Sequence, residues 1–133
     1  MAERTYVMLK PDALERGIAG EIISRIEKKG FKIVDMKMIQ LDLAKVEEHY
    51  AHCIGKPYYP KLRDYMLRGP VIAMIVEGDN AVLGMRLLSG PTEYSENYGG
   101  TIRGDYAKDI TINVIHSSDS PESAEEEIKR FFG

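Results

Sequence analysis

"RTYVMLKPDALERGIAGEIISRIEKKGFKIVDMKM", residues 4–38, contains in order a strand, a helix and a second strand. Residues 4–9 are apolar and β-branched, and they end before Pro11, which cannot donate to a sheet ladder. Apolar residues at helical spacing follow over residues 19–29, and Gly30 is a natural helix stop. This order of elements sets the expectation for the rest of the chain.

The second strand lies in "FKIVDMKMIQL", residues 31–41. Val34, Met36 and Met38 stand on alternate positions with charged residues between them. Successive side chains of a strand point to opposite faces, so the pattern predicts a strand that buries this apolar face.

A pair of helices is expected next. Asp42 is a good N-cap residue. Behind it, apolar residues recur at three- and four-residue spacing: Leu43, Val46, Tyr50 and Cys53. "GKPYYP", residues 55–60, breaks this helix, and residues 61–67 form a short second one.

The second half repeats the pattern. Residues 71–76, "VIAMIV", are apolar throughout, which suits a strand covered on both faces. Residues 80–88 are expected to be helical behind Asp79 or Asn80 as cap. Residues 89–109 are rich in glycine and without periodicity, so we expect a long loop, and long loops in compact domains are often functional. "ITINVI", residues 110–115, predicts a fourth strand.

A closing helix completes the order. Ser120 is its N-cap, Pro121 its first residue and Glu122 an acidic residue in its first turn, and the helix runs to Phe132. Two split βαβ units predict an α+β ferredoxin-like sandwich. Its four-stranded antiparallel sheet (βαββαβ) is expected to carry helices on one face, with an inserted helical pair and a long loop before the last strand. We expect one domain over residues 1–133.

Composition excludes several classes of function. Eighteen Lys plus Arg against 21 Asp plus Glu give a net charge of -3, so no nucleic-acid or membrane partner is expected and any polyanion must be met locally. No apolar run approaches the roughly 20 residues of a membrane span. Cys53 is the only cysteine and cannot form an internal disulfide, and no signal-like apolar core opens the chain. A cytoplasmic protein is expected.

His116 is the candidate for chemistry. We expect it at the carboxyl end of the fourth strand, four residues before Ser120, near a helix N-terminus that favours phosphate. A neutral imidazole there offers a lone pair to act as base, nucleophile or ligand. The alternative is a loop histidine, with Ser117, Ser118 and Asp119 as turn formers.

His49 and His52 lie one helical turn apart beside Cys53, which is one way to build a metal pair. No second cysteine or acidic cluster lies nearby, so surface or interface positions on the helix are the preferred interpretation.

Several stretches together resemble the nucleoside diphosphate kinase family. "NVIHSSDSPESAEEEI", residues 113–128, is similar to that family's active-site signature. Four further stretches resemble the opening strand and lysine, the first helix and second strand, the third strand, and the phosphate-binding turn. These are "ERTYVMLKPDALERG", "GEIISRIEKKGFKIV", "RGPVIAMIVEG" and "GTIRGDY". They cover nearly the whole chain in the family's order and spacing.

The resemblance implies transfer of the γ-phosphoryl group from a nucleoside triphosphate to a nucleoside diphosphate, in two ping-pong halves. His116 would form the phosphohistidine, and Mg²⁺ would bind through phosphate oxygens and water, without a direct protein ligand. Two alternatives stay open. One is a ferredoxin-like module that binds nucleotides without reacting, and the other is a protein histidine phosphotransferase.

The resemblance also assigns residues to the phosphates and sugar. Arg86 and Arg103 would clamp the phosphates with their planar forks, and Thr92 would hydrogen-bond phosphate. Lys10 with Asn113 would hold the sugar hydroxyls near the leaving oxygen. Without the family, these residues would be read as solvated strand-end, helix and turn positions.

The resemblance also assigns residues that would contact the nucleotide base and residues that would orient the catalytic histidine. Tyr58 would be the aromatic platform for the base, with Leu62 beside it, and stacking tolerates every base. Ser118 and Glu127 would orient the catalytic histidine, and Tyr50 matches another pocket position.

Three features depart from the family's pattern. Ser117 replaces a usual glycine or alanine beside the histidine, where a hydroxyl either crowds the site or adds a hydrogen bond. Glu93-Tyr94 and Gly99 replace a usual Asn-Pro and a second proline in the loop. The chain ends at Gly133, where many members carry a further arm. The resemblance implies a homo-oligomer, a hexamer or tetramer built from dimers, without deciding between them.

Overall fold

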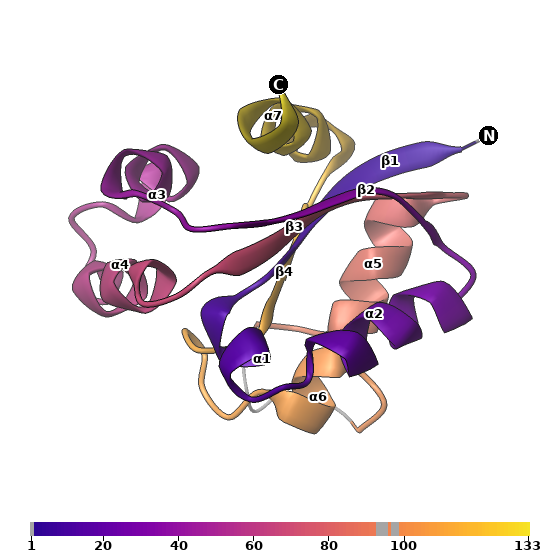
Figure 1. Ribbon diagram of the computed structural model, residues 1–133, viewed down its shortest axis with the longest axis horizontal. Helices are drawn as coiled ribbons and strands as arrows, with labels where there is room; N and C mark the ends of the chain where they lie inside the picture. Colours follow the sequence, from indigo (N-terminus) through magenta and orange to yellow (C-terminus); the bar gives the residue numbers. More distant parts are fainter. Residues whose placement is uncertain (1, 93–95, 97–98) are drawn as a thin grey trace.

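The computed structural model describes residues 2–92, 96 and 99–133. Within these residues four strands form one antiparallel sheet with the order β2-β3-β1-β4 (Figure 1). The strands are β1 (Glu3–Leu9), β2 (Lys32–Ile39), β3 (Val71–Gly78) and β4 (Ile115–Ser117). The predicted α+β sandwich is confirmed, because two split βαβ units place β3 between β1 and β2.

The expected helices connect the strands in the expected order, and two short helices that the sequence did not predict are added to them. The helices are α1 (Pro11–Glu15), α2 (Ala19–Lys28), α3 (Leu43–His49), the short 3₁₀ helix η1 (Ala51–Cys53), α4 (Tyr59–Leu67), α5 (Ala81–Ser89), α6 (Ile102–Tyr106) and α7 (Pro121–Phe132). The two added helices are α1 and α6. The inserted helical pair is α3 with α4. None of the helices in the described ranges has the length and apolar character needed to span a bilayer.

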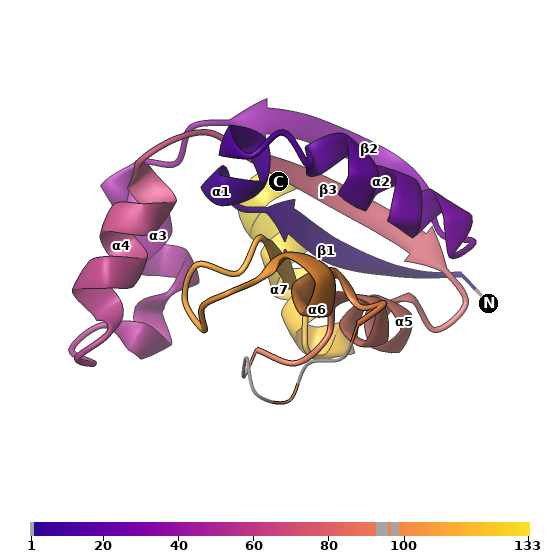
Figure 2. The same ribbon diagram turned by 90° about the horizontal axis from the view of Figure 1, so that it is seen from below.

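Helices cover both faces of the sheet, so the expectation of helices on one face was wrong. Figure 1 shows α7 on one side and α2 and α5 on the other, and Figure 2 shows the same layers from below. The reason lies in β1, whose Tyr6 and Met8 enter one core cluster while Val7 and Leu9 enter the second. A central strand that is apolar on both faces needs cover on both faces.

The strand β2 does not bury the two methionines that were predicted to lie on its buried face. Met36 is 50% exposed and Met38 62% exposed, whereas Ile33 and Ile39 pack against the two cores. The pairing of β2 with β3 shifts register between Ile33 and Asp35. Val34 is the unpaired residue at this shift, so it is out of phase with Met36 and Met38. The two methionines lie opposite Met74 and Ile72 of the second core cluster, but β2 is the edge strand and leaves them exposed.

The helical insertion follows its sequence signals closely. Asp42 caps α3 by accepting the backbone N–H of Lys45 at 2.8 Å. Val46 and Cys53 are buried as predicted, while Leu43 is 48% exposed because it lies at the first helical position, away from the core. The second helix of the pair begins two residues earlier than expected, at Tyr59.

Residues 89–109 contain a helix that the sequence did not predict. Thr101 caps α6 by accepting the backbone N–H of Gly104 at 2.9 Å. Asp105 accepts the backbone N–H of Gly100 and pairs with Arg25 of α2 at 2.6 Å. The helix is stabilised by these polar contacts. The prediction of a loop relied on the absence of apolar periodicity, which does not detect such contacts. Glu93 and Tyr94 lie outside the described residues.

The fourth strand is shorter than predicted. Asp109 accepts the backbone N–H groups of Thr111 and Ile112 at 2.7 and 3.1 Å, which takes them out of any ladder. Val114 has φ 64°, and the Ile115 N–H donates to the Asn113 carbonyl at 2.8 Å, forming a strained γ-turn. Pairing with β1 therefore starts only at Ile115, and His116 lies inside β4 instead of beyond its end.

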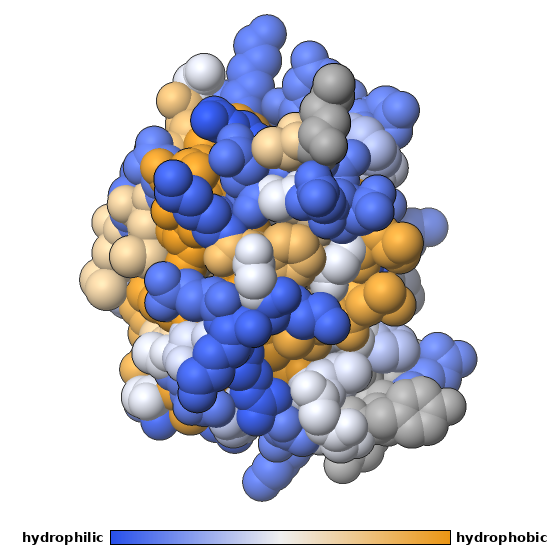
Figure 3. Space-filling view, turned by 90° about the vertical axis from the view of Figure 1, so that its right-hand side faces the viewer, coloured by the Kyte–Doolittle hydropathy of each residue, from blue (hydrophilic) through white to orange (hydrophobic). Residues whose placement is uncertain are grey.

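The surface carries exposed apolar side chains. The face at the right-hand side of Figure 1 shows hydrophobic groups between charged ones (Figure 3). Leu83 and Leu87, one turn apart on α5, are 60% and 65% exposed. Leu83 with Leu87 on α5 and Met36 with Met38 on β2 thus form two pairs of exposed apolar side chains.

A first prediction concerns the packing of Phe31. A Cβ added at Gly84 would lie 2.3 Å from Phe31 Cζ, and one at Gly78 would lie 2.7 Å from Phe31 Cδ1. Overpacking costs about 1–3 kcal/mol, against a helix-propensity gain of about 1 kcal/mol for alanine over glycine. Gly84→Ala should therefore lower the free energy of unfolding by about 1 kcal/mol in urea titrations. The same change in a Phe31→Ala background should be neutral or stabilising; equal losses in both backgrounds would contradict the packing argument.

Candidate active site

Strand register decides where His116 points. His116 lies opposite Met8 in the pairing of β4 with β1, so it shares the face on which Tyr6 and Met8 lie. That face is covered by α7 and α3. Ser117, the next residue, points to the opposite face and toward α5, because side chains alternate along a strand.

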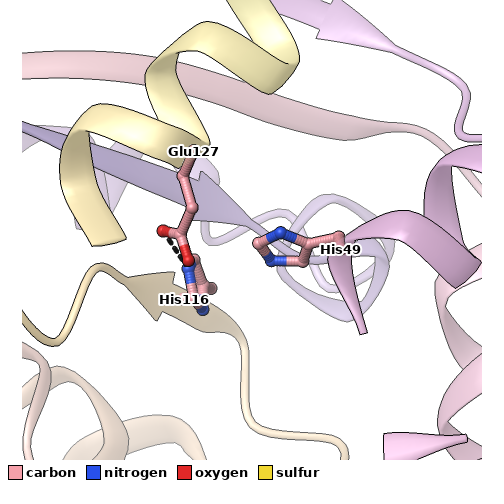
Figure 4. A group of neighbouring side chains, drawn as sticks. All are labelled: His49, His116 and Glu127. Carbon is pink, nitrogen blue, oxygen red and sulfur yellow. Dashed lines mark hydrogen bonds and ion pairs between the residues drawn. The ribbon is translucent and has the colours of Figure 1, made fainter. Parts of the chain in front are cut away.

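His116 has a defined tautomer. Its Nε2 lies 2.8 Å from Glu127 Oε1 (Figure 4). The Ser118 hydroxyl donates to the same oxygen at 2.7 Å. An ionised carboxylate only accepts, so Nε2 carries the proton and Nδ1 keeps a free lone pair. Burial alone would raise the pKa of Glu127, but the hydrogen bonds from His116 and Ser118 lower it, which keeps the carboxylate charged.

The imidazole is also kept neutral. Burial lowers the pKa of His116 below its ordinary value of 6.5, and the nearby cations of Lys10 and Arg103 lower it further. The carboxylate of Glu127 opposes this shift without reversing it. At neutral pH the ring is therefore an uncharged nucleophile or base with one available nitrogen.

Lys10 enters the site from the end of β1. It is 6% exposed, and its Nζ donates to Asn113 Oδ1 at 2.7 Å. Burial, with a smaller contribution from Arg103, lowers its pKa from 10.5 to about 7. The γ-turn at Val114 fixes the position of Asn113, whose amide nitrogen donates to the Ile110 carbonyl at 2.8 Å.

Arg103 is a buried cation held by neutral oxygens. It is 4% exposed and donates to the carbonyls of Gly90 at 2.9 Å and Ile115 at 2.6 Å. A longer contact of 3.4 Å reaches Thr92 Oγ1, and the buried Nε has no partner among the described atoms. Burial, followed by repulsion from Arg86, lowers the pKa of Arg103 to about 10.

Within the described residues these cations have no carboxylate partner in an ion pair. Arg86 donates to the Ser117 carbonyl at 3.1 Å. No ion pair between described residues involves Lys10, Arg86 or Arg103. Because an unpaired buried cation is costly, the arrangement favours an anionic ligand that brings the missing negative charge.

These residues line one cavity of about 730 Å³. The sequence-derived candidates on its walls are Lys10, Tyr50, Tyr58, Leu62, Arg86, Thr92, Arg103, Asn113, His116 and Glu127. Ser118 is buried and reaches the site through Glu127. Tyr58 is 47% exposed at the start of α4, and Leu62 follows one turn later, so the pair forms an apolar wall suited to a planar ring.

Ser117 fits without crowding the site. Its side chain is fully buried, and its Oγ lies 3.3 Å from Ser89 Oγ at the end of α5. The hydroxyl that departs from the family's pattern thus adds a hydrogen bond between β4 and the helix that carries Arg86.

His49 is a residue of the site that was not expected from the sequence. It is 5% exposed and lines the cavity, so the expected surface position was wrong. Its ring centroid lies 4.8 Å from that of His116, and its Nδ1 lies 2.9 Å from Arg130 Nη1. The signal was present: His49 lies three residues after Val46, on the helical face predicted to be buried.

Comparison with known proteins gives the family of this chain. A family model described as nucleoside diphosphate kinase matches residues 3–133. The chain belongs to the nucleoside diphosphate kinase family. An Archaeoglobus fulgidus nucleoside diphosphate kinase is 52% identical over 130 residues, which cover 98% of this chain and 86% of that protein. The corresponding Listeria monocytogenes enzyme is 53% identical, with 98% and 88% covered.

The fold agrees as well. The crystal structure of the Aquifex aeolicus nucleoside diphosphate kinase superposes with a TM-score of 0.93 at 38% identity, covering 100% of this chain and 96% of that one. The protein is therefore a nucleoside diphosphate kinase by family and by fold, an enzyme that acts on nucleotides. Kinase reactions of this family normally need a divalent metal.

The depressed pKa of Lys10 gives a prediction for the kinase without ligand. Between pH 7 and 10.5 the unfolded chain binds this proton and the folded chain does not, so stability rises with pH across the window. Wild type should gain up to about 1.4 kcal/mol per pH unit relative to Lys10→Met between pH 7.5 and 9.5. Urea unfolding at several pH values measures the two slopes; parallel slopes would show that Lys10 is charged when buried.

Proposed function

We propose that His116 is the phosphate-accepting nucleophile of a ping-pong reaction, in which the γ-phosphoryl group of a nucleoside triphosphate passes through phosphohistidine to a nucleoside diphosphate. One observation carries the proposal. The hydrogen bond from His116 Nε2 to Glu127 leaves the Nδ1 lone pair free in a cavity whose cations have no carboxylate partner among the ion pairs of the described residues.

The bonds balance without a proton transfer. The lone pair of His116 Nδ1 attacks the γ-phosphorus, and the bond from phosphorus to the β,γ-bridging oxygen breaks, leaving its electrons on the nucleoside diphosphate. The phosphorylated ring is cationic and keeps its Nε2 proton, and the charge is stabilised by Glu127. In the second half of the reaction, an oxygen of the acceptor nucleoside diphosphate attacks phosphorus. The bond from phosphorus to Nδ1 breaks, and its electrons return to the ring, which is neutral again.

The cations supply the electrostatic part of the catalysis. Arg86 and Arg103 hold phosphate oxygens, and Thr92 adds a hydroxyl donor beside Arg103. Lys10 lies against Asn113, and this pair is suited to sugar hydroxyls near the leaving oxygen. The pKa of about 7 for Lys10 rises when phosphate arrives, since an opposite charge favours the charged amine.

Mg²⁺ is the divalent ion that we propose for this reaction, and the residues fit it. Mg²⁺ bound to the oxygens of the nucleotide phosphates needs no cage of protein carboxylates. Asp119, which lines the cavity, could hold the hydrated ion through water. When bound, the ion neutralises charge on the phosphates.

The nucleoside end of the cavity has its own walls. Tyr58 offers an exposed ring face to the base, and Leu62 packs beside it. Stacking on one face reads no base edge, so we expect broad base specificity. The buried Tyr50 hydroxyl has no partner among the described atoms, and it faces a site where a phosphate or water completes its hydrogen bonding.

We further infer that residues 1–133 act as one catalytic domain in a cytoplasmic homo-oligomer. The lone Cys53 is buried and free, as expected for a reducing compartment. Exposed Met36 and Met38 on the edge strand β2 favour association, because contiguous apolar side chains on a strand edge gain from pairing with another copy.

The test is to mix the protein with γ-labelled ATP and magnesium, without acceptor, beside a His116→Ala variant. Wild type should hold acid-labile, alkali-stable label that GDP discharges, and His116→Ala should hold none. Nucleotide binding without label would instead identify a non-catalytic module. Faster discharge to a histidine-containing protein than to GDP would identify a protein phosphotransferase.

Glu127→Gln should slow phosphate transfer by on the order of 10²-fold, because the amide cannot stabilise the cationic phosphorylated ring. Removing this carboxylate also removes the influence that raises the pKa of His116, so activity should extend to lower pH. Rates measured from pH 5 to 8 check both effects. A rate equal to wild type would exclude the proposed role of the carboxylate.

Met38→Lys should weaken assembly, since it places a charge on the exposed apolar edge of β2. Ala44→Lys is the matched control, because Ala44 is exposed on α3 and the substitution adds the same charge. Sedimentation velocity at several concentrations compares the two variants with wild type. An unchanged distribution for Met38→Lys would move the interface elsewhere.

A further inference from the structure

The phosphate-accepting histidine belongs to a second chemical grouping. His49, His116 and Glu127 come from α3, β4 and α7, and one ligand atom from each lies within 4.8 Å of the others. Figure 4 shows the three side chains converging on a common space. The nucleotide reaction uses His116 and Glu127 but assigns no role to His49.

Two imidazoles and one carboxylate are a donor set suited to zinc and related transition-metal ions. Mg²⁺ is a poor match, because it prefers oxygen ligands. Zinc bonds of about 2.0–2.1 Å place tetrahedral ligand atoms roughly 3.4 Å apart. His116 and Glu127, now 2.8 Å apart, would open slightly, and His49 would move inward.

We propose that His49, His116 and Glu127 form an inhibitory site for zinc or a zinc-like ion, separate in chemistry from the magnesium that accompanies nucleotide.

Arg130 works against this site. Its Nη1 lies 2.9 Å from His49 Nδ1, and because a guanidinium only donates, Nδ1 accepts and Nε2 carries the ring proton. Ligation through Nδ1 needs the lone pair that Arg130 occupies. Ligation through Nε2 moves the proton to Nδ1, where it faces the guanidinium N–H. In either case the contact with Arg130 must break, so replacing Arg130 should strengthen metal binding.

The consequence for catalysis rests on the proposed function. An ion on His116 Nδ1 uses the nucleophilic lone pair directly. An ion on His116 Nε2 displaces the proton that this nitrogen carries. The proton moves to Nδ1, and the Nδ1 lone pair is again lost to the reaction. Metal binding and phosphorylation of His116 therefore exclude one another.

Binding is tested first, without nucleotide. Zinc is titrated by calorimetry, and cobalt by visible absorption, into wild type, His49→Ala, Arg130→Met and His52→Ala. His52 is the matched control, because it is an exposed histidine three residues further along. Cys53 also lines the cavity and is a strong zinc ligand, so all variants are made in a Cys53→Ser background as well. Circular dichroism checks that each variant is folded.

Wild type and His52→Ala should bind one ion per chain with equal affinity, and the tetrahedral cobalt spectrum should appear in both. His49→Ala should weaken binding at least about tenfold, and Arg130→Met should tighten it by a similar factor. Equal affinities for wild type and His49→Ala, or loss of binding with Cys53→Ser, would overturn the site.

A second arm measures labelling of His116 by γ-labelled ATP at fixed free zinc, each variant being compared with its own zinc-free rate. Zinc should suppress labelling in wild type and more strongly in Arg130→Met, and less in His49→Ala. Labelling in wild type that saturating zinc leaves unchanged would overturn the inhibition. If wild type binds zinc but takes no label even without it, the proposed function fails while the metal site stands.

Discussion

The carboxylate of Glu127 accepts hydrogen bonds from His116 and Ser118 at 2.8 and 2.7 Å, and the chemistry of the site depends on this pair of contacts. They exist because α7 lies across the face of β1 to which β4 directs His116. The Ser120 cap sets where α7 begins, and Glu127 follows two turns later on the side toward the sheet. A single tautomer of His116 results, with Nε2 protonated and Nδ1 free.

The site concentrates charge that the fold does not neutralise. The chain is acidic overall, yet Lys10 and Arg103 are buried without carboxylate partners among the described ion pairs. Their lowered pKa values show the desolvation that this arrangement imposes. An anionic ligand offsets this desolvation cost. The stability that the ligand-free protein gives up by burying these cations therefore favours the binding of phosphate.

Local rules on the sequence predicted much of this fold because they matched how the elements are built. Asp42 and Ser120 cap the helices expected of them, and residues 71–76 are buried on both faces as their composition indicated. The resemblance to a family, and not periodicity, supplied the residues of the cavity wall. Composition alone would have left His116 as a loop histidine.

The failures have specific physical causes. Met36 and Met38 lie opposite core residues of β3 but on the edge strand of the sheet, so they stay exposed, and a pattern of period two does not show which strand is at the edge. Asp109 accepts a backbone N–H group in a turn where a strand was expected, and Thr101 caps a helix where a loop was expected. The spacing of apolar residues gives no information on such side-chain acceptors. His49 was missed because a polar residue on a helix was assigned to the surface although its neighbours on that face were buried.

In the proposed mechanism phosphate bonds to one nitrogen of one histidine. The most direct test is to isolate the phosphoprotein after reaction with ATP, with its histidine rings labelled in nitrogen, and to measure phosphorus–nitrogen coupling by NMR. The expected result is a bond from phosphorus to Nδ1 of His116, with the proton still on Nε2. Phosphate on Nε2 of His116, or on any other residue, would contradict the role assigned to Glu127.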